Sequence, residues 1–448
     1  MTEGRSLRGK RVTVVGLGKS GLAAARLLVR EGAQIIATDT RTQTEIGTAA
    51  KTLSDLGVVL ELGGHRVASF STADLIVKSP GISPKLPELV TARSKGVPII
   101  GEVELCVPWL HHPIVAITGT NGKSTTTALT GHLLRTAGRT AFVGGNLGTP
   151  VAEQVLSAER VEATVLELSS YQIDDLVDFR CDVAAVLNVT PDHLERYGSM
   201  EAYTASKERL LSLLTSDGLG ILNADNAPTA AMAARANRRI VRFGHGAETI
   251  RVEHGVIIRG DEKYTVSSKA LRGAHNLENA MAAIESARTL GVDAGSVQRA
   301  LDTYPGLPHR IEHIRILDAV EWINDSKATN VDSVEKSLAA FPGPLHLIMG
   351  GKGKGGSYAP LRPLFPGRVE RLYVIGADAP KIASELGDLV PVERAGDLTT
   401  AVHLARGFAR PGEMVLLSPA CASFDQFKSF EHRGEVFRQA VEHLSEGV

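Results

Sequence analysis

The sequence predicts an α/β protein of three domains whose sheets are mostly parallel. At 448 residues the chain is longer than one hydrophobic core usually supports. Short runs of β-branched residues alternate with helical periodicity almost throughout, as is typical of parallel sheets covered by helices. The alternation starts again after a proline-containing junction at 97–113 and after YPGLPHR (304–310). We therefore expect domains at 1–101, 102–306 and 307–448.

The bulk composition excludes several classes of protein. A formal net charge of −1 argues against a general nucleic-acid binder or a binder of anionic membranes. No run approaches the ~18 apolar residues of a membrane span, and the charged start MTEGRSLRGK is unlike a signal peptide. Cys106, Cys181 and Cys421 are far apart and form no CxxC, which favours reduced thiols. We expect a cytoplasmic globular protein without a nucleic-acid or membrane partner.

The first domain opens with a strand, a glycine turn and a helix. RVTVV (11–15) precedes GLGKSG (16–21), then a helical pattern stops near Gly32, and a second strand, AQIIATD (33–39), follows. GLGKSG matches the dinucleotide fingerprint GxGxxG, and Asp39 stands roughly where that fingerprint expects an acid for the ribose. The pattern indicates a site for a nucleotide diphosphate without choosing among NAD, FAD and a nucleotide sugar; a purely structural turn is the alternative.

The second domain opens with a different glycine loop. PIVAIT (113–118) leads into TGTNGKST (118–125), which ends in Gly-Lys-Ser as a nucleotide-binding P-loop does. The standard P-loop has a further glycine where this chain has Ile117, so the cradle is shorter. Lys123 can supply a point charge for the β- and γ-phosphates, and Ser124 can offer its hydroxyl to Mg²⁺. We expect a central P-loop-type ATPase domain between two Rossmann-like domains.

TGTNGKST resembles the ATP loop of the Mur ligase family, and neighbouring segments extend the resemblance. LELSSYQID (166–174) is similar to the segment that carries the family's Mg²⁺ ligand, here Glu167. A carboxylate at the carboxyl end of a parallel strand also faces the crevice where ligands bind. LNVTPDHLERY (187–197) resembles the segment with the histidine of a second metal site, here His193, and GGNLGTP (144–150) places Asn146 near the acceptor substrate.

Lys207 lies in YTASKERLL, and spacing alone leaves its role open. Its neighbours on one helical face are apolar: Tyr203, Leu210, Leu211 and Leu214. A surface lysine whose stem covers these side chains is one alternative. The resemblance instead implies the family's carbamoylated lysine, which would hold a second Mg²⁺ beside His193.

The last domain adds strand-like segments AVEWIND, LHLIMGG, RLYVIG and EMVLLSPA before turns. The resemblance implies that GAHNLENAMAA (273–283), GLPHRIE (306–312) and WINDSKATN (322–330) supply the ATP face and the site of the incoming amino acid. Helix capping is the alternative for such polar clusters.

Within the family, the segments outside the ATP loop are similar to the D-glutamate-adding members. The upstream GLGKSG unit argues against folylpolyglutamate synthetases, and the DNPR-type signature of diaminopimelate-adding members is absent. DTR (39–41), IVKSPGIS (76–83), GGKGKGG (350–356) and SPACASFDQFKSFEHRG (418–434) carry the similarity. Phe424 stands where the family commonly has leucine, and Lys352 adds a charge to the glycine loop.

The resemblance implies the following residues for each role. The catalytic set is Lys123, Glu167, His193 and Lys207. ATP would contact Gly119, Thr120, Asn121, Gly122, Lys123, Ser124, Thr125, Asn276, Asn279, Arg310 and Asp325. The UDP substrate would contact Gly18, Lys19, Ser20, Asp39, Thr40, Arg41, Ser79, Gly81 and Asn146. D-Glutamate would contact Thr329, Lys354, Ser423, Phe424 and Phe430, with Lys327 nearby. Two Mg²⁺ ions would be held by Ser124, Glu167, His193 and the carbamate of Lys207.

The resemblance implies an ATP-dependent ligase whose substrates are UDP-N-acetylmuramoyl-L-alanine, D-glutamate and ATP, and we expect it to act as a monomer. An acyl phosphate would link phosphoryl transfer to amide formation. Alternatives are another Mur or folylpolyglutamate-type ligase, an NAD-dependent oxidoreductase built on GLGKSG, and a non-catalytic ATP-binding switch. The oxidoreductase alternative leaves the second glycine loop, Glu167 and His193 without a role.

Overall fold

The computed structural model describes residues 6–146, 148–157 and 159–445, which form three sheets in two compact units. The first unit runs to Glu253 and includes Ile258–Glu262 and Met281–Val297. The second comprises His254–Ile257, Lys263–Ala280 and the chain from Gln298 onward. The predicted α/β architecture with mostly parallel sheets is confirmed.

The first sheet has the strand order β3-β2-β1-β4-β5, and every pairing in it is parallel. The strands are β1 (Arg11–Val15), β2 (Gln34–Asp39), β3 (Val59–Leu62), β4 (Leu75–Lys78) and β5 (Ile99–Gly101). The helices are α1 (Lys19–Arg30), α2 (Gln43–Ile46), α3 (Thr48–Asp55), α4 (Val67–Ser71) and α5 (Pro87–Ser94). The strands predicted at 11–15 and 33–39 are present, and Gly32 follows the end of α1 with φ of +77°.

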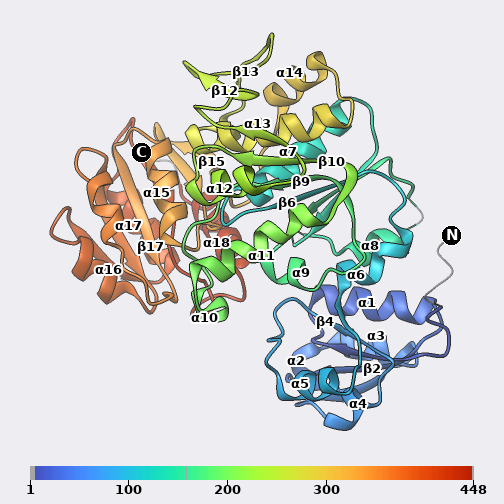
Figure 1. Cartoon of the computed structure of the whole chain (residues 1–448). Helices are drawn as coiled ribbons and strands as arrows, with labels where there is room; N and C mark the ends of the chain where they lie inside the picture. Colours follow the sequence, from blue (N-terminus) through green and yellow to red (C-terminus); the bar gives the residue numbers. More distant parts are fainter. Residues whose placement is uncertain (1–5, 147, 158, 446–448) are drawn as a thin grey trace. The chain divides into compact units, whose positions relative to one another are not determined.

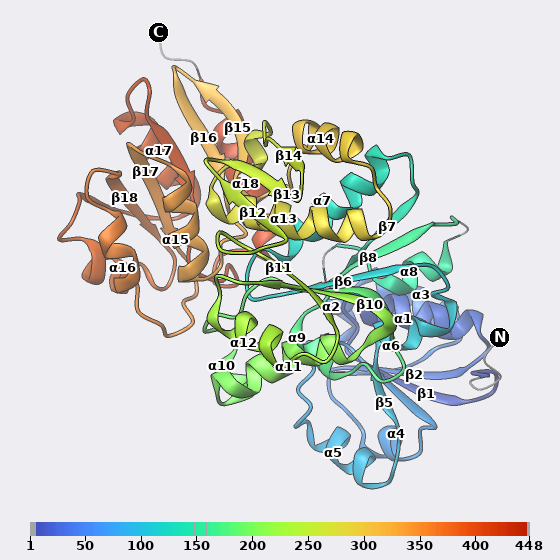
Figure 2. The same cartoon turned by 45° about the horizontal axis from the view of Figure 1, so that its top comes forward.

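The second sheet has the order β14-β13-β12-β11-β10-β9-β6-β8-β7, with parallel pairing from β7 to β12. Its strands are β6 (Ile114–Thr118), β7 (Ala141–Gly145), β8 (Ala163–Glu167), β9 (Cys181–Val186), β10 (Leu214–Asn223), β11 (Arg239–Phe243), β12 (Ile250–Glu253), β13 (Val256–Arg259) and β14 (Glu262–Tyr264). Its helices are α7 (Lys123–Thr136), α8 (Val151–Leu156), α9 (Ser170–Asp174), α10 (Leu194–Tyr197), α11 (Met200–Ser212) and α12 (Ala227–Arg235). Helices α9 and α11 lie side by side in both views (Figures 1 and 2).

The junction between the first two sheets is a packed helix rather than an exposed linker. All five residues of α6 (Glu102–Cys106) are buried, and α6 contacts α1 and α8 (Figure 1). A 3₁₀ turn, Val107–Trp109, follows it. Two buried glutamates therefore lie where the sequence indicates only a change of domain.

The second unit has the sheet order β15-β16-β20-β17-β18-β19. The hairpin of β15 (Glu312–Leu317) and β16 (Val320–Asn324) is antiparallel, and the other pairings are parallel. The remaining strands are β17 (Leu345–Gly350), β18 (Val369–Ile375), β19 (Val392–Gly396) and β20 (Met414–Leu417). Helices α13 (Ala274–Thr289) and α14 (Ala294–Thr303) precede this sheet in the chain and are shared between the two units. The helices that follow β15 and β16 are α15 (Val331–Ala340), α16 (Ala379–Leu386), α17 (Leu398–Phe408) and α18 (Phe430–Glu442).

Both faces of this third sheet are buried, which explains the near-continuous apolar runs of its central strands. Alternate residues of β17 fall into different core clusters: Leu347 packs with α15 and α16, whereas Ile348 packs with α17 and α18. Successive side chains of a strand point to opposite faces, so helices cover the sheet on both sides. Ligand-binding loops are consequently left at the carboxyl edge of the strands.

Among the described residues, no helix is long and apolar enough to cross a membrane. All three cysteines are free and buried, as expected from their spacing.

Candidate active site

The phosphate-type loop lies between β6 and α7, where Gly119 and Gly122 adopt φ of +156° and +84°. A Cβ at Gly119 would come within 3.1 Å of the Leu187 side chain, so the loop requires glycine there. Lys123 Nζ donates to the carbonyl oxygens of Gly119 at 2.8 Å and Thr120 at 2.7 Å. The loop thus combines a helix N-terminus with an ammonium group, the usual elements of a phosphate site.

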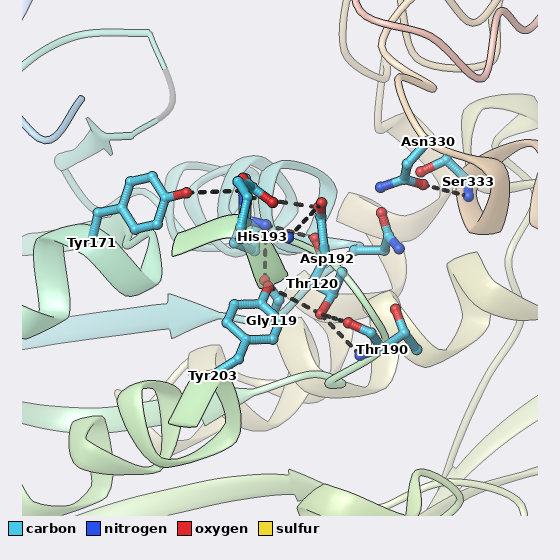
Figure 3. A network of polar contacts seen from close by, with 12 residues as sticks. Gly119, Thr120, Tyr171, Thr190, Asp192, His193, Tyr203, Asn330 and Ser333 are labelled. Atoms are coloured by element: carbon cyan, nitrogen blue, oxygen red, sulfur yellow. Dashed lines mark hydrogen bonds and ion pairs between the residues drawn. The ribbon is translucent and has the colours of Figure 1, made fainter. Parts of the chain in front are cut away.

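Residues after β9 hold the loop in place, and the sequence did not single them out. Asn188 accepts hydrogen bonds from the Thr120 and Asn121 amides through its carbonyl and side-chain oxygens, both at 2.9 Å. The Thr120 hydroxyl lies 3.2 Å from the Tyr203 hydroxyl and accepts from the Thr190 amide at 3.0 Å (Figure 3). These residues reach the loop because β6 and β9 are neighbouring parallel strands and therefore end at the same edge of the sheet.

Glu167 ends β8, the other neighbour of β6, and the residue is only 3% exposed. Its Oε1 accepts from Asn146 Nδ2 at 2.7 Å, whereas its Oε2 is buried without a hydrogen-bond partner. A buried, unpaired carboxylate oxygen is costly unless a cation or donor meets it. The residues present therefore fit the predicted Mg²⁺ ligand.

The described residues contain no group of three or more His, Cys, Asp or Glu side chains arranged to hold a metal. Mg²⁺ usually keeps several waters and binds through one or two carboxylates plus substrate phosphates. A single carboxylate beside a phosphate loop is consistent with this mode of Mg²⁺ coordination. Ser124, at the start of α7, is buried and is the second protein oxygen predicted for this cation.

His193 lies among the aromatic side chains of Tyr171 and Tyr203, as Figure 3 shows. The Tyr171 hydroxyl is 2.9 Å from His193 Nδ1, and a carboxylate oxygen of Asp192 is 3.6 Å from Nε2. His193 adopts φ of +55°, an uncommon conformation for a non-glycine residue. Its side chain is 36% exposed, so the ring remains accessible to a ligand.

Lys207 is buried, so the surface-lysine alternative is wrong. Its side chain is 1% exposed, and its Nζ donates to the Gly119 carbonyl at 2.8 Å. The ammonium also lies 4.7 Å from the ring of Tyr203. Burial, followed by the charge of Lys123, lowers the pKa of Lys207 well below its ordinary value. Among the described residues, no carboxylate forms an ion pair with it.

The first glycine loop is shaped by close backbone approach. A Cβ at Gly21 would lie 1.9 Å from the Gly16 carbonyl oxygen, whereas one at Gly18 would meet nothing within 4 Å. Ser79 donates from its hydroxyl to that same Gly16 oxygen at 2.8 Å. Lys19, Thr40, Arg41 and Gly81 are exposed, and Ser20 is partly so. Their predicted contacts with a UDP substrate stay predictions.

Asp39 has partners within the chain. Its Oδ2 accepts from the Leu17 amide at 2.7 Å, and Arg41 donates to both carboxylate oxygens. Burial alone would raise the pKa of Asp39, but the hydrogen bonds from Arg41 and Leu17 outweigh it and lower the pKa to about 2. Asp39 thus links the first glycine loop to the DTR segment; a ribose contact of the NAD type would compete with these bonds.

In the second unit, Asp325 is fully buried at the end of β16. It accepts hydrogen bonds from the Ser337 hydroxyl at 2.5 Å and the Ser418 hydroxyl at 3.1 Å, and burial raises its pKa. Arg310 lies 3.7 Å from it and lines a cavity of about 500 Å³. Asn276 and Asn279, early in α13, are hydrogen-bonded to each other at 3.0 Å.

The predicted amino-acid residues come from loops at one edge of the third sheet. Strands β16, β20 and β17 are neighbours, and the loops after them contain Thr329, Ser423 and Lys354. Ser423 is 2% exposed, whereas Phe424 is 71% exposed. Phe430 begins α18, and its ring lies 5.0 Å from Lys327 Nζ.

Comparisons with known proteins agree with this arrangement of sheets and loops. Three family models match: "Mur ligase MurD-like, N-terminal domain" at residues 10–101, "Mur ligase middle domain" at 117–287, and "Mur ligase, glutamate ligase domain" at 309–421. The UDP-N-acetylmuramoylalanine--D-glutamate ligase of Anaeromyxobacter dehalogenans is 53% identical, over 97% of each chain. The ligase of the same name from Acidobacterium capsulatum is 46% identical, over 97% of this chain and 96% of its own.

Solved structures share the fold at lower identity. A pseudomurein peptide ligase type C from Methanothermus fervidus has a TM-score of 0.62 at 19% identity, covering 98% of this chain and all of its own. UDP-N-acetylmuramate-alanine ligase MurC from Thermotoga maritima also has a TM-score of 0.62, at 21% identity, covering 97% of this chain and 99% of its own. Sequence similarity over nearly the full length and the three matching domain models lead to one conclusion: the chain belongs to the Mur ligase family.

Proposed function

We propose that this chain is an ATP-dependent ligase that adds D-glutamate to UDP-N-acetylmuramoyl-L-alanine during peptidoglycan precursor synthesis in the cytoplasm. The identities of 53% and 46% to relatives bearing that name support the choice of amino acid. The observation that carries the chemistry is the loop at 119–123. The side chains of Lys123 and Lys207 and the unpaired Oε2 of Glu167 lie at this one edge of the second sheet.

Lys123 has a direct role in the proposed reaction. A carboxylate is a poor electrophile, so the terminal carboxylate of the acceptor first takes the γ-phosphoryl group of ATP and becomes an acyl phosphate. Lys123 neutralises charge on the transferring group, and the amides at the start of α7 orient the remaining phosphates. The amine of D-glutamate then attacks the acyl carbon and phosphate leaves through a tetrahedral intermediate.

Glu167 and Ser124 would hold Mg²⁺, which, when bound, neutralises phosphate charge and orients the phosphoryl group. Asn146 fixes one oxygen of Glu167, so the other oxygen keeps a defined direction. His193 is proposed as a ligand of a second Mg²⁺, with Tyr171 setting the orientation of its ring.

We further propose that Lys207 is carbamoylated. The deprotonated amine of Lys207 would add to CO₂, forming an N–C bond and releasing one proton, so that the side chain becomes an anionic carbamate. Burial of the amine at 1% exposure and the absence of a carboxylate partner among the described residues support this. A Lys207→Ala variant should lose activity and regain part of it with acetate or bicarbonate. Normal activity in the variant, with nothing to rescue, would remove the proposal.

The decisive experiment for the function is phosphate release from MgATP with UDP-N-acetylmuramoyl-L-alanine and each candidate amino acid in turn. Release should depend on the UDP substrate and should be fastest with D-glutamate, with L-glutamate as the stereochemical control. Release with another amino acid would reassign the substrate within the family. Release that ignores every amino acid would contradict the ligase proposal, and the chain is expected to sediment as a monomer throughout.

A further inference from the structure

Arg433 is a fully buried arginine near the start of α18, and its guanidinium contacts three loops. Nε donates to the Ser326 hydroxyl at 3.0 Å and Nη2 donates to the Ser326 carbonyl at 2.8 Å. Nη1 donates to the carbonyl oxygens of Cys421 at 3.1 Å and Gly350 at 3.5 Å. One side chain therefore connects the loops that follow β16 and β20 with the last residue of β17, where the third loop begins.

The backbone around Arg433 is adapted to this contact. A Cβ at Gly351 would lie 3.2 Å from Nη1 and 2.4 Å from the Ala422 carbonyl, so only glycine fits between the two loops. The Ser326 hydroxyl also donates to the Phe430 carbonyl at 2.8 Å, which ties the first loop to the start of α18. The loops are thus held to one another as well as to the arginine.

The contact is electrostatically unusual. All four acceptors of Arg433 are neutral, and none of the carboxylates in the described part of the chain forms an ion pair with it. Burying a cation without a directly paired carboxylate is costly, since Asp425 and Asp325 attract it only at longer range. An apolar side chain of similar volume would fold at lower cost. Arginine offers what an apolar residue or lysine lacks, a planar fork of five N–H donors that reaches several acceptors at once.

We propose that Arg433 is a positioning residue for the amino-acid substrate, which it does not itself touch. It fixes the three loops that carry Thr329, Lys354 and Ser423, the side chains assigned to D-glutamate; the inference rests on the proposed function. Asp325, assigned to the ATP side, receives hydrogen bonds from Ser337, Ser418 and the Ile311 amide and none from Arg433. Loss of Arg433 therefore weakens the amino-acid site more than the nucleotide site.

The test is steady-state kinetics of Arg433→Lys, which keeps the charge and loses the fork. Because the lost hydrogen bonds hold the loops of the amino-acid site, KM for D-glutamate should rise about tenfold or more. KM for ATP and for the UDP substrate should stay within about twofold of the wild-type values. Arg438→Lys is the matched control, because Arg438 lies on the same helix and pairs with Glu312, and it should change none of the three.

A milder variant keeps the proposal testable if Arg433→Lys does not fold. Ser326→Ala removes the hydroxyl partner and leaves the backbone acceptors, so it should raise KM for D-glutamate a few-fold with thermal unfolding near wild type. An unchanged KM for D-glutamate in the folded variants, or an equal rise in all three KM values, overturns the inference. Wild-type enzyme that shows no D-glutamate-dependent phosphate release would instead overturn the proposed function.

Discussion

Lys123 and Lys207 both donate a hydrogen bond to the Gly119 carbonyl, each at 2.8 Å. Burial is the main cause of the lowered pKa of Lys207, and the charge of Lys123 on the same acceptor adds to it. An incoming triphosphate would relieve the repulsion between the two lysines. Before Lys207 is carbamoylated, the pair therefore favours an anion at this loop; after carbamoylation, Lys123 is the cation of the pair.

Replacing Lys123 by alanine should reduce kcat by about 10²–10³-fold, because a preorganised positive group facing the transferring phosphoryl is lost. The measurement is phosphate release at saturating substrates. Folding should be little affected, since the two hydrogen bonds described for this lysine go to carbonyls of its own loop. The control is Lys51→Ala, which removes a surface lysine paired with Asp55. A Lys123→Ala enzyme with nearly wild-type kcat would exclude this role.

Gly21 and Gly18 provide a matched pair in the first glycine loop. Gly21→Ala forces a methyl group to 1.9 Å from the Gly16 carbonyl and should destabilise the fold by about 1–3 kcal/mol or more. A Cβ at Gly18 would meet no atom within 4 Å, and φ there is −75°, so Gly18→Ala should leave the free energy of unfolding unchanged. Urea unfolding of both variants checks this. Equal stability of the two would mean that the loop relaxes around the added methyl group.

At the scale of elements, apolar runs predicted the strands well but did not reveal the polar contacts between elements. The runs at 11–15, 113–118 and 345–351 became β1, β6 and β17, because residues buried on both faces need no alternation. Asn188 and Arg433 act between elements far apart in sequence, so no local pattern marks them. Tyr203 was seen as part of an apolar face, and its hydroxyl contact with the loop required the fold.

Helix α6 shows the same limit. Glu104 accepts hydrogen bonds from the amides of Val177, Asp178 and Phe179, and Glu102 accepts one from Ala152 near the start of α8. Sequence reasoning placed only a junction here. Burial raises the pKa of Glu102 from an ordinary 4.5 to about 7, and its Oε2 is buried without a partner.

Glu102→Gln should change how stability depends on pH. Because the folded-state pKa of Glu102 is raised, its contribution to the free energy of unfolding is most favourable below about pH 4.5. That contribution is lost as pH rises to about 7. Glutamine does not ionise, so between about pH 5 and pH 8 the free energy of unfolding of the variant should rise relative to wild type by on the order of 1–3 kcal/mol. Thermal unfolding across that range is the measurement. The control is Glu248→Gln, whose carboxylate is exposed; a parallel profile for Glu102→Gln would contradict the expectation.

At the scale of the whole molecule, the proposed ligands are divided between two compact units. The phosphate loop and Glu167 belong to the first unit, whereas Thr329, Lys354 and Ser423 belong to the second. The amine must meet the acyl carbon before water does, since an acyl phosphate hydrolyses. Proximity of well-oriented reactants is worth up to about 7–11 kcal/mol, so the reaction needs the two units brought together around the substrates.

We therefore expect the chain to close when its ligands bind. Small-angle scattering should give a smaller radius of gyration with a non-hydrolysable ATP analogue plus UDP-N-acetylmuramoyl-L-alanine than with either alone, at protein concentrations where the scattering mass stays that of one chain. Lys123→Ala with the same ligands is the control and should stay closer to the unliganded dimensions, because its phosphate contacts are weakened. An unchanged envelope in the wild-type protein at saturating ligand would mean that water is excluded by some means other than closure, and D-glutamate would then have to reach a site already assembled.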